Sequence, residues 1–294
     1  RNIGTADVAT FFKSTGISVR DFYRQGRSLV ELGYQIFGGP EPSELDKEGA
    51  KALGRMLHLD DLSRIRAYQS ILGSAAIDPD DPYTMMFAHS LFGVSVDKSS
   101  AANRIDQLRR TLIAREIVDV LEILNTERSR AVLPTDDPST PLAVHGTYSR
   151  AEIVAAFGLA FTGADVAGVR FAKEMKADLA FVTLNKTELH FSPSTMYADT
   201  ALSSRIFQWE SQATTSETSE TGRRYVNHRE MGTSFHLFVR DWKTDPETRV
   251  TMPFVYFGPA DYLSHVGSKP MRIQWRLQHE IPAEILVKSK VIAS

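Results

Sequence analysis

The stretch MRIQWRLQ, residues 271–278, alternates strictly between apolar and polar side chains. Met271, Ile273, Trp275 and Leu277 occupy one set of alternate positions, and arginines and glutamines occupy the other. Because the side chains of a strand point to its two faces in turn, this pattern predicts a strand with one buried face. The second half of the chain is therefore expected to contain a β domain.

Four further runs in the second half are short and rich in Val, Phe or other apolar residues, at positions 169–172, 179–184, 234–240 and 250–257. β-Branched and aromatic residues favour strands. Five such strands with few helical patterns between them predict a compact, strongly curved sheet or barrel. Residues 211–221, SQATTSETSET, are low in complexity and are expected to form a mobile loop.

The first half of the chain shows helical periodicity instead. Ser18 and Ser43 each precede a run with helical spacing of apolar residues, as helix N-caps do. Apolar side chains also recur every three or four residues in a longer segment, which predicts a buried helix face. The members of this stripe are Ile105, Leu108, Leu112, Ile117, Val120, Leu121 and Leu124.

These patterns predict an α+β protein with two domains. Residues 1–131 are expected to form an all-α domain, and residues 148–294 a mainly β domain. The segment 132–147 is rich in Pro, Asp, Thr and Ser, which is typical of a linker. Glu152 follows Ser149 by three residues, a capping-box spacing that predicts a short helix just after the linker.

Composition limits the chemistry of the chain. The 294 residues include no cysteine, which excludes disulfides, thiolate zinc sites and cysteine nucleophiles. No apolar run is long enough to cross a membrane and no signal-peptide pattern is present, so we expect a cytoplasmic protein. The net charge of −2 gives no global attraction to DNA, so contacts with phosphates would have to come from local clusters.

No catalytic motif can be assigned. The histidines form no metal-ligand pair of known spacing, and there is neither a Gly-x-Ser-x-Gly elbow nor a phosphate-binding glycine loop. We therefore expect no catalytic residue, no metal and no cofactor on this chain. It starts with Arg1 rather than Met, so we expect it to be part of a longer protein.

Aromatic and amide side chains in the loops of the β half suit recognition of a nucleobase. Tyr197 and Trp209 are candidates for stacking on a flipped base, because every base offers a π-face. Asp199, Asn185 and Gln212 are candidates for hydrogen bonds to the base edge. Structural roles are open alternatives: Asn185 in a turn, Asp199 as a helix cap, and both aromatic residues in the core.

The densest basic cluster of the chain follows the Ser/Thr-rich segment. Arginines beside an aromatic residue suit a phosphate clamp, although a solvated strand edge explains the pattern equally well. Two residues of the strand at 271–278, Arg272 and Arg276, could extend this patch. The phosphate-binding candidates are Lys186, Arg205, Arg223, Arg224 and Arg229.

Several long runs resemble the C-terminal region of SauUSI-like modification-dependent restriction proteins, which combine a phospholipase-D-type nuclease with a superfamily II helicase. The runs are DLAFVTLNKTELHFSPSTMYAD (178–199), FQWESQATTSETSETGRRYVNH (207–228), FVYFGPADYLSHVGSKPM (254–271) and IQWRLQHEIP (273–282). The helical half is similar as well, notably in DFYRQGRSLVEL (21–32).

The resemblance implies a helical coupler followed by an SRA/PUA-like barrel that reads 5-methylcytosine, or a related modified cytosine, by base flipping in duplex DNA. It also implies an upstream nuclease and helicase that use ATP and Mg²⁺, a role in phage defence by restriction, and a possible homodimer. Two alternatives stay open. The chain could be a structural coupling or dimerisation module of a helicase-nuclease, or it could read DNA sequence without regard to methylation.

Overall fold

The computed structural model describes residues 8–74, 76–93, 96–128, 130–134, 140–161, 167–185 and 199–292. The chain forms two compact units. The helical unit comprises residues 1–131, 139–141 and 150–164, and the β unit comprises 132–138, 142–149 and 165–294. The chain thus crosses between the units repeatedly around residues 132–165 before it continues in the β unit.

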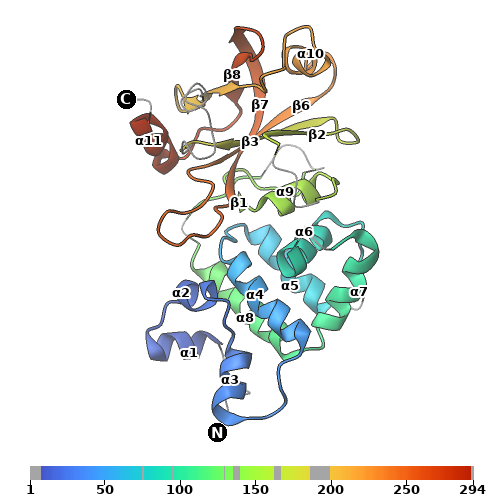
Figure 1. The fold of residues 1–294 in the computed structure, drawn as a ribbon, viewed down its shortest axis with the longest axis vertical. Helices are drawn as coiled ribbons and strands as arrows, with labels where there is room; N and C mark the ends of the chain where they lie inside the picture. The colour runs from blue at the N-terminus through green and yellow to red at the C-terminus, as the bar shows by residue number, and fades with distance from the viewer. Residues whose placement is uncertain are drawn as a thin grey trace. The chain divides into compact units, whose positions relative to one another are not determined.

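The helical unit is built from short helices (Figure 1). Ser18 and Ser43 cap their helices as expected, and Ser43 forms a capping box with Asp46. The helices are α1 (Val8–Thr15), α2 (Val19–Arg24), α3 (Leu29–Phe37), α4 (Glu44–Met56), α5 (Leu62–Gly73), α6 (Pro82–Phe92), α7 (Lys98–Leu108), α8 (Leu112–Thr126) and α9 (Arg150–Ala156).

The predicted apolar stripe belongs to two helices rather than one. A break after Leu108 separates α7 from α8, and Thr111 is the N-cap residue of α8. All members of the stripe are buried except Leu112, which is 65% exposed at the start of α8. The periodicity correctly identified which side chains are buried. It could not reveal the break between the two helices, because apolar side chains before and after the break both face the core.

The β unit contains one sheet in the order β2-β3-β6-β7-β8-β5-β4, with β1 pairing only with β7. The pairing of β3 with β6 is parallel, whereas the other pairings are antiparallel. Its strands are β1 (Thr147–Tyr148), β2 (Val169–Ala172), β3 (Ala177–Thr183), β4 (Thr200–Ala201), β5 (Ile206–Glu210), β6 (Ser234–Arg240), β7 (Phe254–Val266) and β8 (Arg272–Leu277). Two helices complete the unit, α10 (Glu220–Val226) and α11 (Ala283–Ile292).

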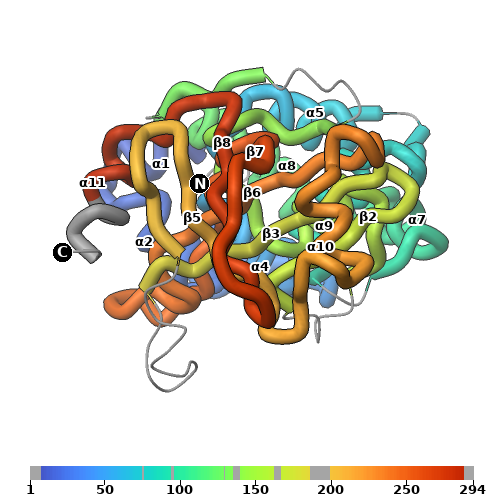
Figure 2. The backbone as a smooth tube through the Cα atoms, turned by 90° about the horizontal axis from the view of Figure 1, so that it is seen from above, coloured from blue at the N-terminus to red at the C-terminus, as the bar shows by residue number. Residues whose placement is uncertain are grey.

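The expected α+β class is confirmed, but the expected closed barrel is wrong. Among the described strands, β2 and β4 are the two edges of an open sheet. Curvature comes instead from β7, whose registers with β6 and with β8 both shift once along its 13 residues. Gly258 in this strand has φ +93°, a conformation that side-chain-bearing residues rarely adopt. The hairpin of β7 and β8 can be followed in Figure 2.

The segment expected to be a linker contributes to the folded β unit. Leu133 and Val144 form a β-bridge, and Leu142 and Val144 are almost fully buried. The helix predicted after this segment is α9, which packs on α6 in the helical unit. Among the described helices of both units, none is sufficiently long and apolar to span a membrane.

Candidate nucleic-acid interface

The alternating strand β8 presents a polar face to solvent, together with its neighbours β5 and β7. Cross-strand pairs place Gln208 opposite Gln274 and Glu210 opposite Arg272. Apolar residues at the intervening positions of β8 are buried, so these polar residues lie on the opposite side of the sheet. We call the set Gln208, Glu210, Ser264, Arg272, Gln274 and Arg276 the outer face.

The outer face carries amides between two arginines. Ser264 and Gln274 lie 3.4 Å apart between Oγ and Oε1, which extends the polar row onto β7. Arg272 is 3.5 Å from Glu210, measured between Nη2 and Oε1. Arg276 is exposed and makes no ion pair or hydrogen bond with its side chain within the described part of the chain. A planar guanidinium without a partner is suited to bind a phosphate or a carboxylate in two-point contact.

The Ser/Thr-rich segment beside this face is built of turns that lead into α10. Ser219 caps α10 by accepting the Gly222 amide at 3.1 Å, and its hydroxyl donates to the Ser216 carbonyl at 2.6 Å. Thr215 and Ser216 are buried. A Cβ at Gly222 would lie 1.8 Å from the Ser216 carbonyl oxygen, so only glycine fits there. The expected mobile loop is therefore a packed helix entry.

The two arginines at the centre of the basic cluster have different environments. Arg223 is exposed on α10. Arg224 is buried and binds Asp178 in β3 through two bonds, Nε to Oδ2 at 2.6 Å and Nη2 to Oδ1 at 2.9 Å. Its guanidinium also lies 3.9 Å from the centre of the Phe171 ring. The phosphate-binding role expected for Arg224 is corrected, because the guanidinium is buried and its Nε–Nη2 edge is occupied by Asp178 inside the β unit.

Burial and pairing act in opposite directions on this ion pair. Desolvation raises the pKa of Asp178, and the bonds from Arg224 partly offset that rise. Desolvation also lowers the pKa of Arg224, but Asp178 more than compensates and the net shift is upward. The pair is therefore a structural contact between α10 and β3, in which each buried charge is neutralised by the other.

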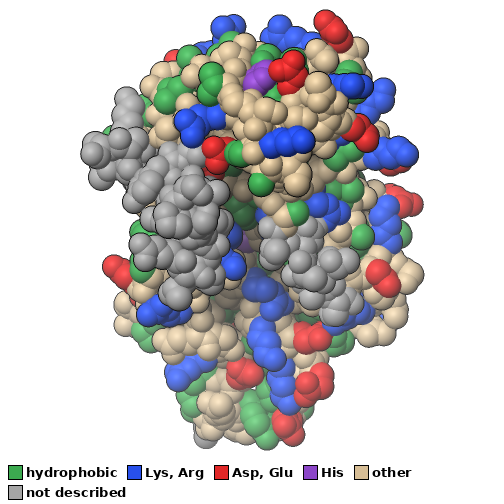
Figure 3. All heavy atoms as spheres, turned by 45° about the horizontal axis from the view of Figure 1, so that its top comes forward, with side chains coloured by type: hydrophobic (Ala, Val, Ile, Leu, Met, Phe, Trp, Pro, Cys, Tyr) green, Lys and Arg blue, Asp and Glu red, His purple; other side chains and the backbone are tan. Residues whose placement is uncertain are grey.

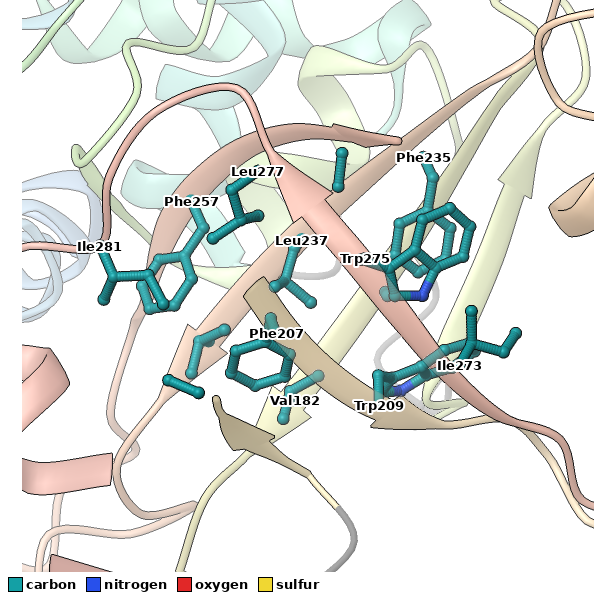
Figure 4. Close-up of a cluster of buried hydrophobic side chains, with 14 of the residues drawn as sticks. Val182, Phe207, Trp209, Phe235, Leu237, Phe257, Ile273, Trp275, Leu277 and Ile281 are labelled. Atoms are coloured by element: carbon teal, nitrogen blue, oxygen red, sulfur yellow. The ribbon is translucent and has the colours of Figure 1, made fainter. Parts of the chain in front are cut away.

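Trp209 is 4% exposed and lies in the aromatic core of the β unit (Figure 4). Its ring packs edge to face on Tyr225, with 5.6 Å between centroids, and lies 5.4 Å from that of Phe235. Phe235 in turn stacks on Trp275 at 3.7 Å with an interplanar angle of 7°. The stacking role expected for Trp209 is corrected to a core role, because neighbouring rings cover the faces that a base would need.

The remaining candidates for base recognition have varied positions. The Asp199 carboxylate accepts the Glu210 amide at 2.9 Å, which ties the residue to β5. Asn185 is half-buried, and its backbone amide donates to the Asp241 carbonyl at 2.8 Å. Gln212 is exposed in the turn before α10. Tyr197 lies outside the described residues.

Two of the other phosphate candidates are exposed but paired. Arg229 binds Asp261 at 2.8 Å between Nη2 and Oδ2. Arg205 lies 3.2 Å from Glu280 and also donates to the Gln278 carbonyl at 3.3 Å. Lys186 lies outside the described residues. Arg223 and Arg276 are therefore the cations best placed to bind an external anion.

Several polar contacts of β5, β7 and β8 were not predicted from the sequence. A chain of hydrogen-bonding groups joins the Tyr262 hydroxyl to His265 Nδ1 at 2.7 Å and His265 Nε2 to Glu217 at 3.3 Å. This chain holds the turn before α10 against β7. The cross-strand pair of Gln208 and Gln274 was also missed, because the alternation within one strand does not give its register with another.

The surface around these elements has mixed charge. Figure 3 shows Lys and Arg side chains interspersed with acidic side chains over the visible face. Within the described residues, no three His, Asp or Glu side chains come together as a possible metal site. The arrangement can therefore supply local anion contacts and amide hydrogen bonds.

Comparison with known proteins gives one family. A model described as a domain of unknown function, DUF3427, matches residues 142–288. No curated protein shows significant similarity to the chain. The matched segment includes every described strand of the sheet and all residues of the outer face.

Proposed function

The chain belongs to the DUF3427 family, and from this premise we propose that its β unit is the DNA-binding, target-recognition region of an ATP-dependent, modification-dependent restriction enzyme. The observation that supports DNA binding most directly is the outer face, where the unpaired Arg276 adjoins a row of amides. Guanidinium groups and amides are the side chains that most often contact phosphates and base edges.

The expected affinity from phosphate contacts alone is modest. Among the candidate arginines described above, Arg223 and Arg276 are free to bind phosphate, with Arg229 available only if it leaves Asp261. Two or three neutralised phosphates give a slope of log K against log salt of roughly −2 to −3 on B-DNA. Because the chain has a net charge of −2, selectivity must come from contacts with the base rather than from general attraction.

Selectivity for 5-methylcytosine or a related modified cytosine is the finer part of the proposal, and the sequence resemblance supports it. With Trp209 in the core, Tyr197 is the remaining stacking candidate, and Gln212, Asp199 and Asn185 remain candidates for the base edge. In this proposal the chain has no catalytic residue. ATP and Mg²⁺ serve the helicase and nuclease domains of a longer, cytoplasmic protein.

The test measures binding of the chain to three labelled duplexes of one sequence by fluorescence anisotropy. The duplexes contain 5-methylcytosine, cytosine or no cytosine at the central position. We expect the methylated duplex to bind at least about tenfold more tightly than the other two, a difference of about 1.4 kcal/mol. Equal affinity for methylated and unmethylated duplexes would remove the modified-base proposal and favour methylation-insensitive recognition.

Variants test the two unpaired arginines, Arg223 of α10 and Arg276 of the outer face. Replacing Arg223 and Arg276 together with alanine should weaken binding to every duplex and reduce the salt slope by about 2. Lys173→Ala is the matched control, since this exposed lysine lies on the turn between β2 and β3, away from the outer face. If the double variant binds as tightly as the control, neither Arg276 of the outer face nor Arg223 of α10 contacts DNA.

A coupling module is a second candidate, and one observation favours it. Residues 150–164 lie within the family-matched segment, yet they belong to the helical unit. Glu152 of α9 is completely buried there and receives hydrogen bonds from Arg64 at 3.0 Å and Tyr68 at 2.9 Å. A folded chain that binds none of the three duplexes would favour coupling over DNA recognition.

A further inference from the structure

His228 joins the end of α10 to strand β7 through a hydrogen bond that fixes its protonation state. The residue follows α10 closely and is buried. Its Nε2 accepts the backbone amide of Tyr262 at 3.1 Å. A ring nitrogen that accepts a hydrogen bond carries no proton, so His228 is neutral here and its proton is on Nδ1. A proton on Nε2 would place two N–H donors against each other.

A carboxylate lies close to the same ring nitrogen. Oδ1 of Asp261 is 3.9 Å from His228 Nε2, too far for a hydrogen bond but close enough for attraction between full charges. This carboxylate is already bound by Arg229, whose Nε lies 3.2 Å from Oδ1 and whose Nη2 lies 2.8 Å from Oδ2. One permanent cation and one titratable side chain therefore flank the carboxylate of Asp261.

The pair of Arg229 and Asp261 is open to solvent. The Arg229 side chain is 71% exposed and that of Asp261 is 25% exposed. Ion pairs between exposed side chains contribute little to stability, so such a pair can be exchanged readily. Asp261 also lies opposite Arg276 in the ladder of β7 and β8, which brings a further cation to it from β8. With His228 neutral, these four side chains carry one net positive charge, and with His228 protonated they carry two.

The surroundings of His228 keep its ring neutral near pH 7. Burial lowers the pKa of His228, while a backbone hydrogen bond with Thr233 and the charge of Asp261 oppose the shift. The positive charge of Arg229 adds to the lowering. On β8 the ring of Trp275, which is uncharged, lies 6.1 Å from the imidazole between centroids. Asp261 and Arg229 are therefore the charges that act on His228 within the described residues, and their effects are opposite.

We propose that protonation of His228 transfers Asp261 from Arg229 to the imidazolium and so releases Arg229 to bind an external phosphate. The proton comes from solvent and binds Nε2, which breaks the hydrogen bond from the Tyr262 amide. The imidazolium is buried, so water and salt screen its attraction to Asp261 less than they screen that of exposed Arg229. The released guanidinium can bind phosphate in two-point contact. The phosphate contact rests on the proposed DNA binding, whereas the exchange of partners does not.

An NMR titration of the complete chain from about pH 8 to about pH 5 tests the exchange of partners without DNA. The ring nitrogens of His228 and the amide of Tyr262 should change together, with one apparent pKa below about 6.5. Through the same range, the Arg229 Nε signal should move toward its position in the Asp261→Asn variant, in which the pair is absent. A Tyr262 amide or an Arg229 signal that does not follow the titration of His228 would overturn the proposal.

Variants of the two charges give opposite shifts. Asp261→Asn should lower the pKa of His228, because it removes the charge that favours the imidazolium, and Arg229→Gln should raise it. Arg110→Gln is the matched control, since it removes an exposed arginine paired with Asp106 in the helical unit, and it should leave this pKa unchanged. Equal pKa values of His228 in all three variants would contradict its coupling to Asp261 and Arg229.

Fluorescence anisotropy with the methylated duplex at both ends of this pH range tests the release of Arg229. At constant ionic strength, the chain should bind about two- to fivefold more tightly at the acidic end. This gain should disappear in Arg229→Gln and in His228→Gln, whose side-chain oxygen can still accept the Tyr262 amide but cannot take up a proton. A gain that persists in both variants, or an affinity of the original chain that does not change with pH, would overturn the phosphate contact. If no duplex binds at either pH, the proposed function fails, and the NMR titration still decides the exchange of partners.

Discussion

Replacing Arg224 with methionine should strongly destabilise the β unit and make its stability depend on pH. The arginine makes a two-point contact with Asp178, and the two side chains are only 9% and 2% exposed. Methionine retains much of the packing volume beside Phe171 but leaves the carboxylate without its partner. Breaking one side of such a buried ion pair typically costs about 3–5 kcal/mol. We expect a loss of this size at pH 7.

The pH dependence follows from the protonation of Asp178. Its pKa in the folded protein is already above the ordinary value because of burial, and loss of Arg224 removes the contacts that oppose the rise. A carboxyl whose folded pKa is raised contributes most below the unfolded pKa, near 3.9, and its contribution is lost as pH rises through the folded pKa. The variant should therefore lose less stability near pH 4 than at pH 7.

Urea unfolding, monitored by tryptophan fluorescence, measures this loss of stability in the β unit. All three tryptophans, Trp209, Trp242 and Trp275, belong to the β unit, so their emission reports on that unit alone. Adding Asp178→Asn to the methionine variant removes the titrating group. The double variant should regain stability at pH 7 and lose the dependence on pH. A single variant that costs under about 1 kcal/mol at pH 7, with no pH dependence, would refute this account of the pair.

Three other variants address contacts elsewhere in the structure. Gly222→Ala should cost at least about 2 kcal/mol in urea unfolding, because its Cβ would overlap the Ser216 carbonyl oxygen at 1.8 Å. Gly168→Ala has open space around the new Cβ and should be nearly neutral. Equal effects of the two variants would contradict the packing of α10. Glu152→Gln should lower the stability of the helical unit by about 3 kcal/mol, because buried Arg64 loses its closer carboxylate partner at 3.0 Å and retains only Asp60 at 3.6 Å. Far-UV circular dichroism should show this loss as a lower melting temperature, and an unchanged melting temperature would argue against this network. Trp209→Leu should lower the free energy of unfolding by about 2–4 kcal/mol but leave the DNA affinity of the folded protein unchanged. A selective loss of affinity for the methylated duplex would mean that this residue belongs to the base-binding site.

Local patterns in the sequence predicted five of the described strands, although β1, β4 and β5 were missed and the strand expected at 250–257 is β7 at Phe254–Val266. The helix caps at Ser18 and Ser43 and the alternation in residues 271–278 depend on neighbours within a few positions, and both were confirmed. The same alternation placed Arg272 and Arg276 on the solvent side of β8. Such features can be read from one chain segment because the geometry that produces them is local.

The roles of individual arginines and aromatic residues could not be predicted in this way. Arg223 and Arg224 are neighbours in the sequence, but only Arg224 meets a carboxylate, which is supplied by a strand 46 positions earlier. Trp209 resembled a binding residue because loops and cores both use tryptophan. Only the rings that surround it, from Tyr225 and Phe235, decide that it is buried.

The sequence by itself determined the α+β class, the separation of a helical part from a mainly β part, and the faces of the helices and strands that lie in the cores. Tertiary structure alone decided that the sheet is open, that α9 joins the helical unit, and that Arg223 is exposed while its neighbour Arg224 is paired. The reason is the range of the interactions. Side-chain periodicity reflects contacts along one segment, whereas strand register and ion pairs depend on segments that are distant in the chain.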